Sequence, residues 1–336
     1  MRAAVVDEAG APIRIEERER PEPGPGQLLL RVRACGVCHS DVNVRDGHVP
    51  DTAFPTVPGH EVVGEVVERG EGVDAPAEGE RVGVPWLYAG CGRCDRCVEG
   101  EGILCPEMEV TGATRDGGYA DFMLAEAGWV APVPDALDDV EAAPLMCAGI
   151  TVFQGLRNAG FEPGDRVAVL GLGGLGHLGV RYAAAMGGRV AVLSTSPGKE
   201  EDARALGAER FVDVGAGDPA EALQDWGGAD VILGTAPSSS AMSAVVPGLA
   251  PDGTLVVMGI EDAVLEAHPM DLILGRRRVL GSPSGSRKDL RACLDFSARH
   301  GIAARVEETF PLEGAGAALE AVESGRLSGR AVLVTD

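Results

Sequence analysis

Two different patterns of hydrophobic and polar positions divide the chain. Residues 1 to about 150 contain short apolar runs separated by Gly and Pro, and such runs predict strands joined by loops. The predicted strands cover 3–6, 28–34, 61–68, 81–87 and 120–125. This part of the chain therefore predicts a β-rich domain with many loops.

Apolar strands alternate with helical segments from about residue 151 onward. Strands are predicted at 166–171, 189–194, 211–214, 229–236 and 253–260. Helices are predicted at 177–187, 199–208 and 240–250. This alternation predicts an α/β domain with a doubly wound parallel sheet.

The tail from about residue 285 returns to a mixed pattern and ends in a predicted strand at 329–335. Because the tail resembles the first part, the α/β domain is predicted to be inserted into the β-rich one. The boundaries we expect are 1–150, 151–284 and 285–336. A chain of 336 residues is long enough for two such domains.

Composition narrows the range of functions. The chain has 52 acidic and 29 basic residues and a formal net charge of -23 at pH 7, which opposes binding to nucleic acid. No apolar run approaches the roughly 18 residues of a membrane span. The N-terminus lacks the basic and apolar regions of a secretory signal. We expect a soluble, cytoplasmic protein that binds neither nucleic acid nor membrane.

Four cysteines lie in one short segment with the spacing C-x2-C-x2-C-x7-C: Cys91, Cys94, Cys97 and Cys105. Four thiolates at these separations can form a closed tetrahedral shell around one zinc ion, with no position left for substrate. A disulfide pairing is the alternative, which the short spacing and a cytoplasmic setting disfavour. We therefore predict a structural zinc site.

A glycine-rich loop follows the predicted strand at 166–171. Gly171, Gly173 and Gly176 form a G-x-G-x-x-G sequence that includes Gly174 and Leu175 and opens a predicted helix. In this context the loop is typical of a site for the pyrophosphate of a dinucleotide. A glycine-rich turn without a ligand is the alternative, which the flanking strand and helix disfavour.

The end of the next strand bears on the choice of dinucleotide. It carries Ser194, Thr195 and Ser196, followed by Lys199, and no carboxylate. A carboxylate there would bind the adenosine ribose and repel a 2′-phosphate, whereas hydroxyls and an ammonium can bind that phosphate. We predict NADP(H). NAD(H) stays the alternative, because Ser196 could simply cap the following helix.

Three further side chains of metal-binding type lie far apart in the sequence: Cys38, His60 and Cys147. Two thiolates and one imidazole would leave a fourth position open for water or substrate, as in the catalytic site of alcohol dehydrogenases. Taken singly, such residues are more often buried in a core or bonded within a loop. The sequence alone does not show that the three meet.

The chain resembles the zinc-dependent medium-chain alcohol dehydrogenases over essentially its whole length. The matching segments are GVCHSD, VPGHEVVGEV, the four-cysteine segment, CAGIT, GLGGLGHLG and the terminal GRAVL. Within that family, VLSTSPGKEE and PGHEVVGEV are most similar to the NADPH-linked cinnamyl alcohol dehydrogenase and broad aldehyde reductase branch. The resemblance implies a GroES-like catalytic domain with an inserted Rossmann domain, two zinc ions per subunit, and a homodimer or homotetramer.

The resemblance also implies roles around the metal. It assigns a catalytic zinc to Cys38, His60 and Cys147, and a structural zinc to the four-cysteine segment. Glu61 matches a glutamate that can reach the catalytic metal when water leaves. Asp41 matches the residue that orients the zinc-bound histidine.

Other matching positions concern the proton and the cofactor. Ser40 matches the hydroxyl that passes the alcohol proton onward, and His39 matches a position that faces the cofactor pyrophosphate. Thr151 and Arg330 match positions near the cofactor, Arg330 near its phosphates.

The chain departs from the family pattern at two positions. Related chains often carry a histidine at the position of Asn43, where it ends the proton relay. The proton is therefore expected to leave through the ribose hydroxyl and water, with His48 as the alternative. Val49 stands where related enzymes often have tryptophan, which indicates room for bulkier substrates. Trp86 is expected either to line the substrate pocket or to belong to the core.

These features predict a zinc-dependent alcohol dehydrogenase or aldehyde reductase that transfers a hydride between NADP(H) and a primary alcohol or aldehyde. One alternative is an NAD-linked alcohol or polyol dehydrogenase. The other is a non-catalytic protein that binds NADPH and zinc. The joint presence of Cys38, Asp41, His60 and Cys147 favours an enzyme, because a binding protein would not need all four.

Overall fold

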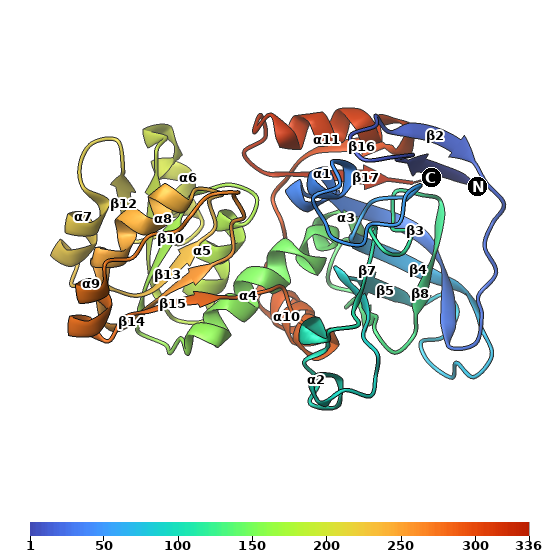
Figure 1. Cartoon of the computed structure of the whole chain (residues 1–336), viewed down its shortest axis with the longest axis horizontal. Coiled ribbons are helices and arrows are strands. Elements are labelled where there is room, and N and C mark those ends of the chain that lie inside the picture. Colours follow the sequence, from blue (N-terminus) through green and yellow to red (C-terminus); the bar gives the residue numbers. More distant parts are fainter. Residues whose placement is uncertain (336) are drawn as a thin grey trace. The chain divides into compact units, whose positions relative to one another are not determined.

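The computed structural model describes residues 1–335. Contacts within the chain divide it into two compact units (Figure 1). The first unit consists of Met1–Ile150 and Gly285–Asp336, and the second of Thr151–Ser284. The chain passes from the first unit to the second within helix α4 (Ala148–Ala159).

The first unit is built on a seven-stranded sheet with the order β16-β17-β3-β4-β5-β9, in which β8 also pairs with β3. Its strands are β3 (Gln27–Val37), β4 (Glu61–Arg69), β5 (Arg81–Val84), β8 (Phe122–Glu126), β9 (Ala131–Pro132), β16 (Val306–Pro311) and β17 (Arg330–Val334). Neighbouring strands are antiparallel except the parallel β16–β17 pair. Two small sheets pair β1 (Arg2–Val5) with β2 (Arg14–Glu17), and β6 (Leu87–Ala89) with β7 (Glu109–Val110).

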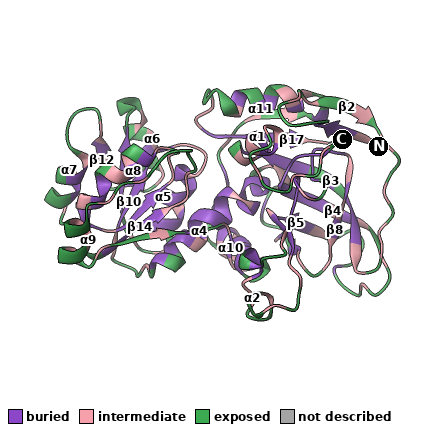
Figure 2. Cartoon of the chain, in the orientation of Figure 1, coloured by how far each residue is buried: buried purple, intermediate pink, exposed green. Residues whose placement is uncertain are grey.

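Helices and single helical turns lie between these strands in the sequence. They are α1 (His39–Arg45), α2 (Asp95–Val98), η1 (Gly102–Leu104), α3 (Asp139–Ala142), η2 (Ala143–Met146), α10 (Arg287–His300), η5 (Leu312–Gly314) and α11 (Ala315–Glu323). The long strand β3 is buried along most of its length, and its apolar residues form one core with those of β4, β17 and α11 (Figure 2).

The second unit is a six-stranded parallel sheet with the order β12-β11-β10-β13-β14-β15. Its strands are β10 (Arg166–Leu170), β11 (Arg189–Ser194), β12 (Arg210–Asp213), β13 (Ala229–Gly234), β14 (Leu249–Val257) and β15 (Arg278–Gly281). The connecting helices are α5 (Gly176–Ala185), η3 (Pro197–Lys199), α6 (Glu200–Ala205), α7 (Pro219–Asp225), α8 (Ser239–Val245), η4 (Val246–Gly248) and α9 (Pro269–Gly275). The predicted doubly wound parallel sheet is confirmed.

The strand predicted at 253–260 spans Leu249–Val257, and the helix predicted at 199–208 ends at Ala205. Two other predicted elements run across a proline at which the structure interrupts them. The helix predicted at 240–250 ends at Val245, because Pro247 has no amide hydrogen for the helical ladder and the chain instead forms η4 and enters β14. The strand predicted at 81–87 ends at Val84, and Pro85 separates it from β6. In both places a proline inside an apolar run marks the break.

Within the described residues, no helix combines the length and the apolar character that crossing a bilayer requires.

Candidate active site

The three widely separated ligands meet in the first unit, and Glu61 joins them. The ligand atoms of Cys38, His60, Glu61 and Cys147 all lie within 4.8 Å of one another. Cys38 is the residue before α1, and Glu61 begins β4 directly after His60. Cys147 stands between η2 and α4. The sheet and two helix junctions thus bring together residues from three parts of the sequence.

The imidazole of His60 is oriented for a ligand. Its Nδ1 lies 2.7 Å from Oδ1 of the buried Asp41, so this nitrogen carries the proton that the carboxylate accepts. The other ring nitrogen, Nε2, is buried without a hydrogen-bond partner among residues 1–335. Trp86 packs edge-on against the ring, with centroids 4.9 Å apart. An orphaned imidazole lone pair of this kind fits a metal ion.

The carboxylate of Glu61 is shared between an arginine and the metal-binding group. Nη2 of Arg330 donates to Oε1, and Oε2 is buried with no partner in the described part of the chain. Gly36 on β3 leaves room for this side chain, because a Cβ there would lie 1.9 Å from Oε2. Burial raises the pKa of Glu61 to about 8, although Arg330 acts in the opposite direction.

The two cysteines of this group influence each other. A hydrogen bond from the Cys147 thiol and the nearby His60 lower the pKa of Cys38 well below its usual value. The same contact, together with burial, raises the pKa of Cys147. Two cysteine sulfurs, an imidazole lone pair and a carboxylate oxygen that lie together in this way form a donor set that suits a zinc ion. The residues therefore fit the catalytic zinc that the sequence predicts.

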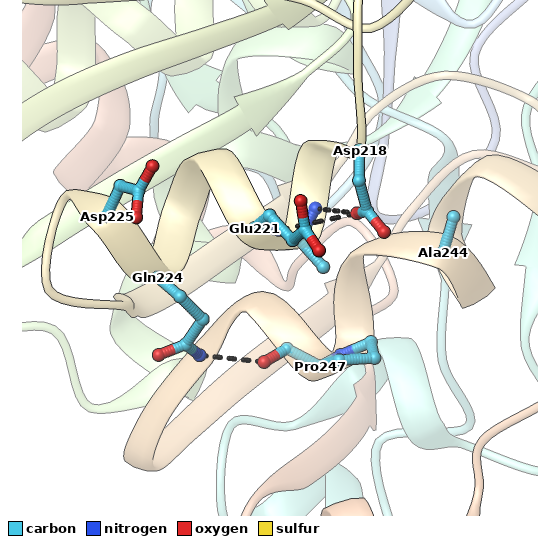
Figure 3. Close-up of a pocket in the computed structure, with 7 residues that line it drawn as sticks. Asp218, Glu221, Gln224, Asp225, Ala244 and Pro247 are labelled. Carbon is cyan, nitrogen blue, oxygen red and sulfur yellow. Dashed lines mark hydrogen bonds between the residues drawn. The ribbon is translucent and has the colours of Figure 1, made fainter.

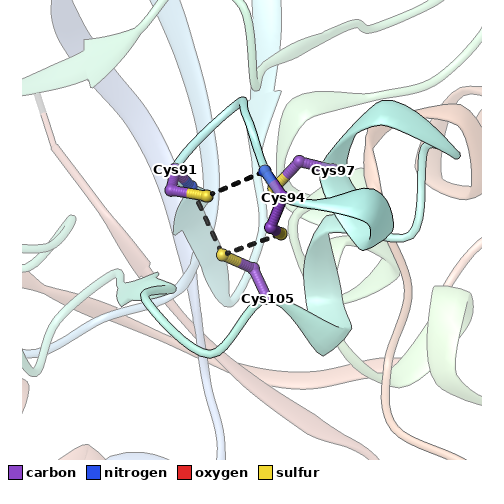
Figure 4. Close-up of side chains that lie close together, drawn as sticks. All are labelled: Cys91, Cys94, Cys97 and Cys105. Atoms are coloured by element: carbon purple, nitrogen blue, oxygen red, sulfur yellow. Dashed lines mark hydrogen bonds between the residues drawn. The ribbon is translucent and has the colours of Figure 1, made fainter.

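The four-cysteine segment forms a second group in the first unit (Figure 4). The sulfur atoms of Cys91, Cys94, Cys97 and Cys105 lie within 4.8 Å of one another. All are free thiols, and the sulfurs of Cys94 and Cys105 are 3.8 Å apart, so the disulfide alternative was wrong.

Backbone amides point at the sulfur atoms of this group. The amides of Cys91 and Glu107 each lie 3.4 Å from the sulfur of Cys105, and the amide of Cys94 lies 3.4 Å from that of Cys91. Amide donors lower the pKa of Cys91 to about 7, whereas burial and the neighbouring sulfurs raise that of Cys97 to about 12. Four neighbouring thiolates repel one another, so all four cysteines can be deprotonated together only when a cation lies among their sulfurs. The group therefore fits a closed zinc site.

The glycine loop of the second unit has a backbone geometry that explains its glycines. Gly171 directly follows β10 and has a φ of 95°, in the region that favours glycine. A Cβ on Gly176 would lie 1.9 Å from the carbonyl oxygen of Gly171, so helix and loop approach closely. A Cβ on Gly173 would meet no atom within 4 Å, which leaves the backbone open to a ligand. The cradle fits a dinucleotide pyrophosphate above the start of α5.

The polar residues after β11 lie beside this loop. Nζ of Lys199 donates to the carbonyl oxygen of Leu172 at 2.8 Å. Oγ of Ser194 accepts from the amide of Ser196 at 3.1 Å, while the Thr195 and Ser196 side chains are exposed. The end of β11 and the residues after it thus provide three hydroxyls and one ammonium group near the glycine loop.

The remaining predicted positions differ in their exposure. Thr151 is buried in α4. His39 begins α1 and is exposed, whereas Ser40 is half-buried. His48 is exposed, and only its backbone amide is bonded to Asn43.

A hollow on the surface of the second unit contains no cysteine or histidine among its lining residues and so does not resemble the two metal-binding groups (Figure 3). It is lined by α7 and the region of η4, including Asp218, Glu221, Asp225 and Gln224. Asp218 caps α7 through the amides at its start, and Gln224 donates to the carbonyl oxygen of Pro247 at 2.7 Å. Its polar groups therefore hold local structure together.

Comparison with known proteins agrees with the geometry. Residues 24–135 match the alcohol dehydrogenase GroES-like domain family, and residues 174–299 match the zinc-binding dehydrogenase family. An alcohol dehydrogenase of Geobacillus stearothermophilus is 41% identical over 99% of this chain and 98% of its own.

Two solved structures have the same fold. A cinnamyl alcohol dehydrogenase from Sorghum bicolor superposes with a TM-score of 0.90 at 33% identity, over 99% of this chain and 97% of that one. A structure described as an NAD-dependent alcohol dehydrogenase superposes with a TM-score of 0.92 at 29% identity, over 100% of both chains. The fold is therefore a GroES-like unit combined with a Rossmann-type unit.

A cysteine–histidine group in a GroES-like unit, within a chain that also contains a Rossmann-type unit, defines the class of zinc-binding dehydrogenases. The chain belongs to the zinc-dependent medium-chain alcohol dehydrogenases, and the function it shares with them is that of an alcohol dehydrogenase.

Two contacts at the metal group have no strong signal in the sequence. Tyr119 donates from its hydroxyl to Oδ2 of Asp41 at 3.1 Å, and only the preceding Gly117 and Gly118 hint at a close approach of the backbone. The pairing of Arg330 with Glu61 joins residues 269 positions apart. Neither contact is visible in local spacing.

Proposed function

We propose that this enzyme interconverts primary alcohols and aldehydes with NADP(H), using one catalytic and one structural zinc per subunit. Residues 1–150 and 285–336 would form the catalytic domain, and 151–284 the cofactor domain. The observation that carries the proposal is the convergence of Cys38, His60, Glu61 and Cys147 around a buried imidazole nitrogen without a partner. A binding module with a structural zinc would not need this group.

The chain's own residues prepare the site for carbonyl chemistry. Lewis acidity and the hydride are what bound zinc and NADP(H) supply. Asp41 fixes the ring of His60 so that its free nitrogen faces Cys38 and Cys147. Ser40, half-buried at the start of α1, would carry the alcohol proton toward the ribose hydroxyl and water. The exposed His48 is the less favoured exit.

The apolar surroundings of the metal group favour an uncharged substrate. Trp86 touches His60 and belongs to a small apolar cluster with Val49 and Met108, all three only partly buried. A valine in place of an aromatic side chain leaves more space, so bulky and aromatic aldehydes should be accepted. The test is a panel of aldehydes and alcohols, beginning with benzaldehyde, in which the absorbance of NADPH is followed. Absence of turnover across the panel would favour the non-catalytic alternative.

The preference for NADP(H) depends on the residues after β11. Lys199 already lies against the glycine loop, and Ser194 ends the strand where a carboxylate would repel a 2′-phosphate. The name of one structural neighbour, an NAD-dependent alcohol dehydrogenase, keeps NAD(H) as the second candidate. An efficiency with NADH at least about tenfold above that with NADPH, which corresponds to about 1.4 kcal/mol, would overturn the preference.

Ser194→Asp should reverse the cofactor preference. A carboxylate at the end of β11 would repel the 2′-phosphate, and we expect kcat/KM for NADPH to fall by about tenfold or more while that for NADH is kept or rises. Ser194→Asn is the matched control, since it has the same size without the charge. If Ser194→Asp lowered kcat/KM equally for NADPH and NADH, the substitution would have damaged the loop, and Ser194 would not discriminate the 2′-phosphate.

We also propose that the second unit forms the contact between subunits. β15 is an edge strand of the parallel sheet. The segment that follows β14, together with α9 and β15, exposes large apolar side chains: Ile260, Val264, Ile273, Leu274 and Val279. A homodimer or homotetramer would bury apolar side chains of this segment.

Leu274→Glu should weaken the assembly. Leu274 is 77% exposed within the chain, so the substitution should leave the subunit folded. A charge in an apolar contact is expected to shift the protein to a smaller species at micromolar concentration, measured by light scattering coupled to size exclusion. An unchanged mass in Leu274→Glu, or a monomeric wild-type protein, would contradict the proposal.

A further inference from the structure

The carboxylate of Asp41 receives four hydrogen bonds. Its Oδ1 accepts from Nδ1 of His60 at 2.7 Å and from the amide of Gly59 at 3.2 Å. Its Oδ2 accepts from the amide of Cys38 at 2.9 Å and from the hydroxyl of Tyr119 at 3.1 Å. Three of these donors belong to, or directly precede, the predicted metal ligands. Tyr119 is the one donor of the four that comes from a distant segment of the chain.

Tyr119 also shapes the backbone in front of His60. The ring is fully buried, and the amide of Tyr119 donates to the carbonyl oxygen of Pro58 at 3.0 Å. Gly59 has a φ of 102°, and a Cβ there would lie 2.4 Å from Cδ1 of the Tyr119 ring. The ring therefore lies against the residue that precedes His60, while its hydroxyl reaches the carboxylate on which His60 depends.

The hydroxyl of Tyr119 acts as a donor toward Asp41. Burial and the charge of Asp41 raise the pKa of Tyr119 well above its usual value, so the phenol keeps its proton. Its bond fixes Oδ2, and this limits rotation of the carboxylate about its own axis. Because Oδ1 and Oδ2 belong to one rigid plane, holding Oδ2 also fixes the oxygen that accepts from His60.

We infer that Tyr119 is a positioning residue of the catalytic metal site, which acts through Asp41 to aim Nε2 of His60 at the metal. This inference rests on the proposed catalytic zinc. The carboxylate that orients a metal-bound histidine is itself held in place, and loss of such outer contacts typically costs about 10–100-fold in metal affinity. The four-cysteine group has no contact of this kind with Tyr119, so its zinc should be unaffected.

Tyr119→Phe tests the inference, because it removes one oxygen atom and keeps the ring against Gly59. Metal binding is measured on the full-length protein by competition with a chromophoric chelator, with Zn²⁺ and with Co²⁺. We expect the affinity of one of the two sites to fall by about tenfold or more, with altered cobalt absorption bands, while the other site keeps its affinity. Tyr88→Phe is the matched control, since it removes a buried hydroxyl of the same unit that is not bonded to Asp41.

A double substitution separates positioning from general stability. In an Asp41→Asn background the hydroxyl has lost the carboxylate through which it acts, so adding Tyr119→Phe should lower metal affinity by less than about threefold. Replacing Tyr119 by 4-aminophenylalanine, which retains a donor at the same position, should restore most of the affinity.

Three results would overturn the inference. They are wild-type metal affinity in Tyr119→Phe, an equal loss at both sites, and a failure of Tyr119→Phe to fold, which would assign the hydroxyl to the stability of the unit. A wild-type protein that binds a single metal ion would instead refute the catalytic zinc, so the two failures are distinguishable.

Discussion

Cys38→Ser is expected to lower kcat by about a thousandfold or more while the protein stays folded. Cys38 contributes the thiol with the lowered pKa in the buried group that also contains His60 and Cys147. A serine hydroxyl is a poor ligand for zinc at neutral pH. Without the metal, polarisation of the substrate oxygen is lost, and a loss of about 4 kcal/mol of transition-state stabilisation corresponds to a factor of about a thousand.

The measurement combines steady-state kinetics with metal analysis and circular dichroism. Cys35→Ser is the matched control, because Cys35 is also buried and lies three residues before Cys38, near the end of β3, but is outside the metal group. It should keep activity within about threefold, in line with the modest cost of a substitution that preserves packing. Wild-type rates in Cys38→Ser would refute the assignment of a catalytic metal to this residue.

Cys97→Ser is expected to act on stability before it acts on catalysis. α2 contributes no buried residue, so this lobe has little apolar core of its own. The order of the lobe therefore depends on a closed metal site, and structural zinc sites contribute folding free energy directly. We expect the thermal midpoint to fall by about 10 °C, which corresponds to a loss of about 3 kcal/mol for a domain of this size.

This effect is measured by thermal denaturation together with zinc content. Zinc should fall from two ions to one per chain, while the turnover of freshly prepared protein is largely kept. Arg93→Gln serves as the control in the same segment, since it breaks the exposed ion pair with Glu107 and leaves all four cysteines in place, and it should shift the midpoint by less than about 2 °C. An unchanged midpoint and an unchanged zinc content in Cys97→Ser would show that the four cysteines do not hold a metal.

The sequence alone predicted the two features whose residues lie close together along the chain. Four cysteines within one segment, and a glycine loop between a strand and a helix, carry their geometry in the order of neighbouring residues. Cys38, His60 and Cys147 are different, because their meeting depends on the fold of a whole unit. They were predicted through family resemblance, and the structure brings their ligand atoms together.

The contacts that the sequence did not indicate join distant segments through ordinary residues. The bond from Tyr119 to Asp41 spans 78 positions, and tyrosine is common in cores without any such bond. The two predicted elements that the structure interrupts were wrong for a local reason. The predicted helix at 240–250 and strand at 81–87 followed apolar runs, but Pro247 and Pro85 interrupt them because a proline cannot supply an amide hydrogen.

The pairing of Glu61 with Arg330 has a consequence for how the protein is made. During synthesis the ribosome delivers β4 long before β17, so the nascent chain carries a glutamate whose partner has not yet been translated. The environment of the catalytic ligands is complete only once β17 has joined β3. The predicted catalytic ion would therefore reach its final setting only after β17 has been synthesised and paired, whereas the cysteine lobe, encoded within one short stretch, could take up an ion earlier in translation.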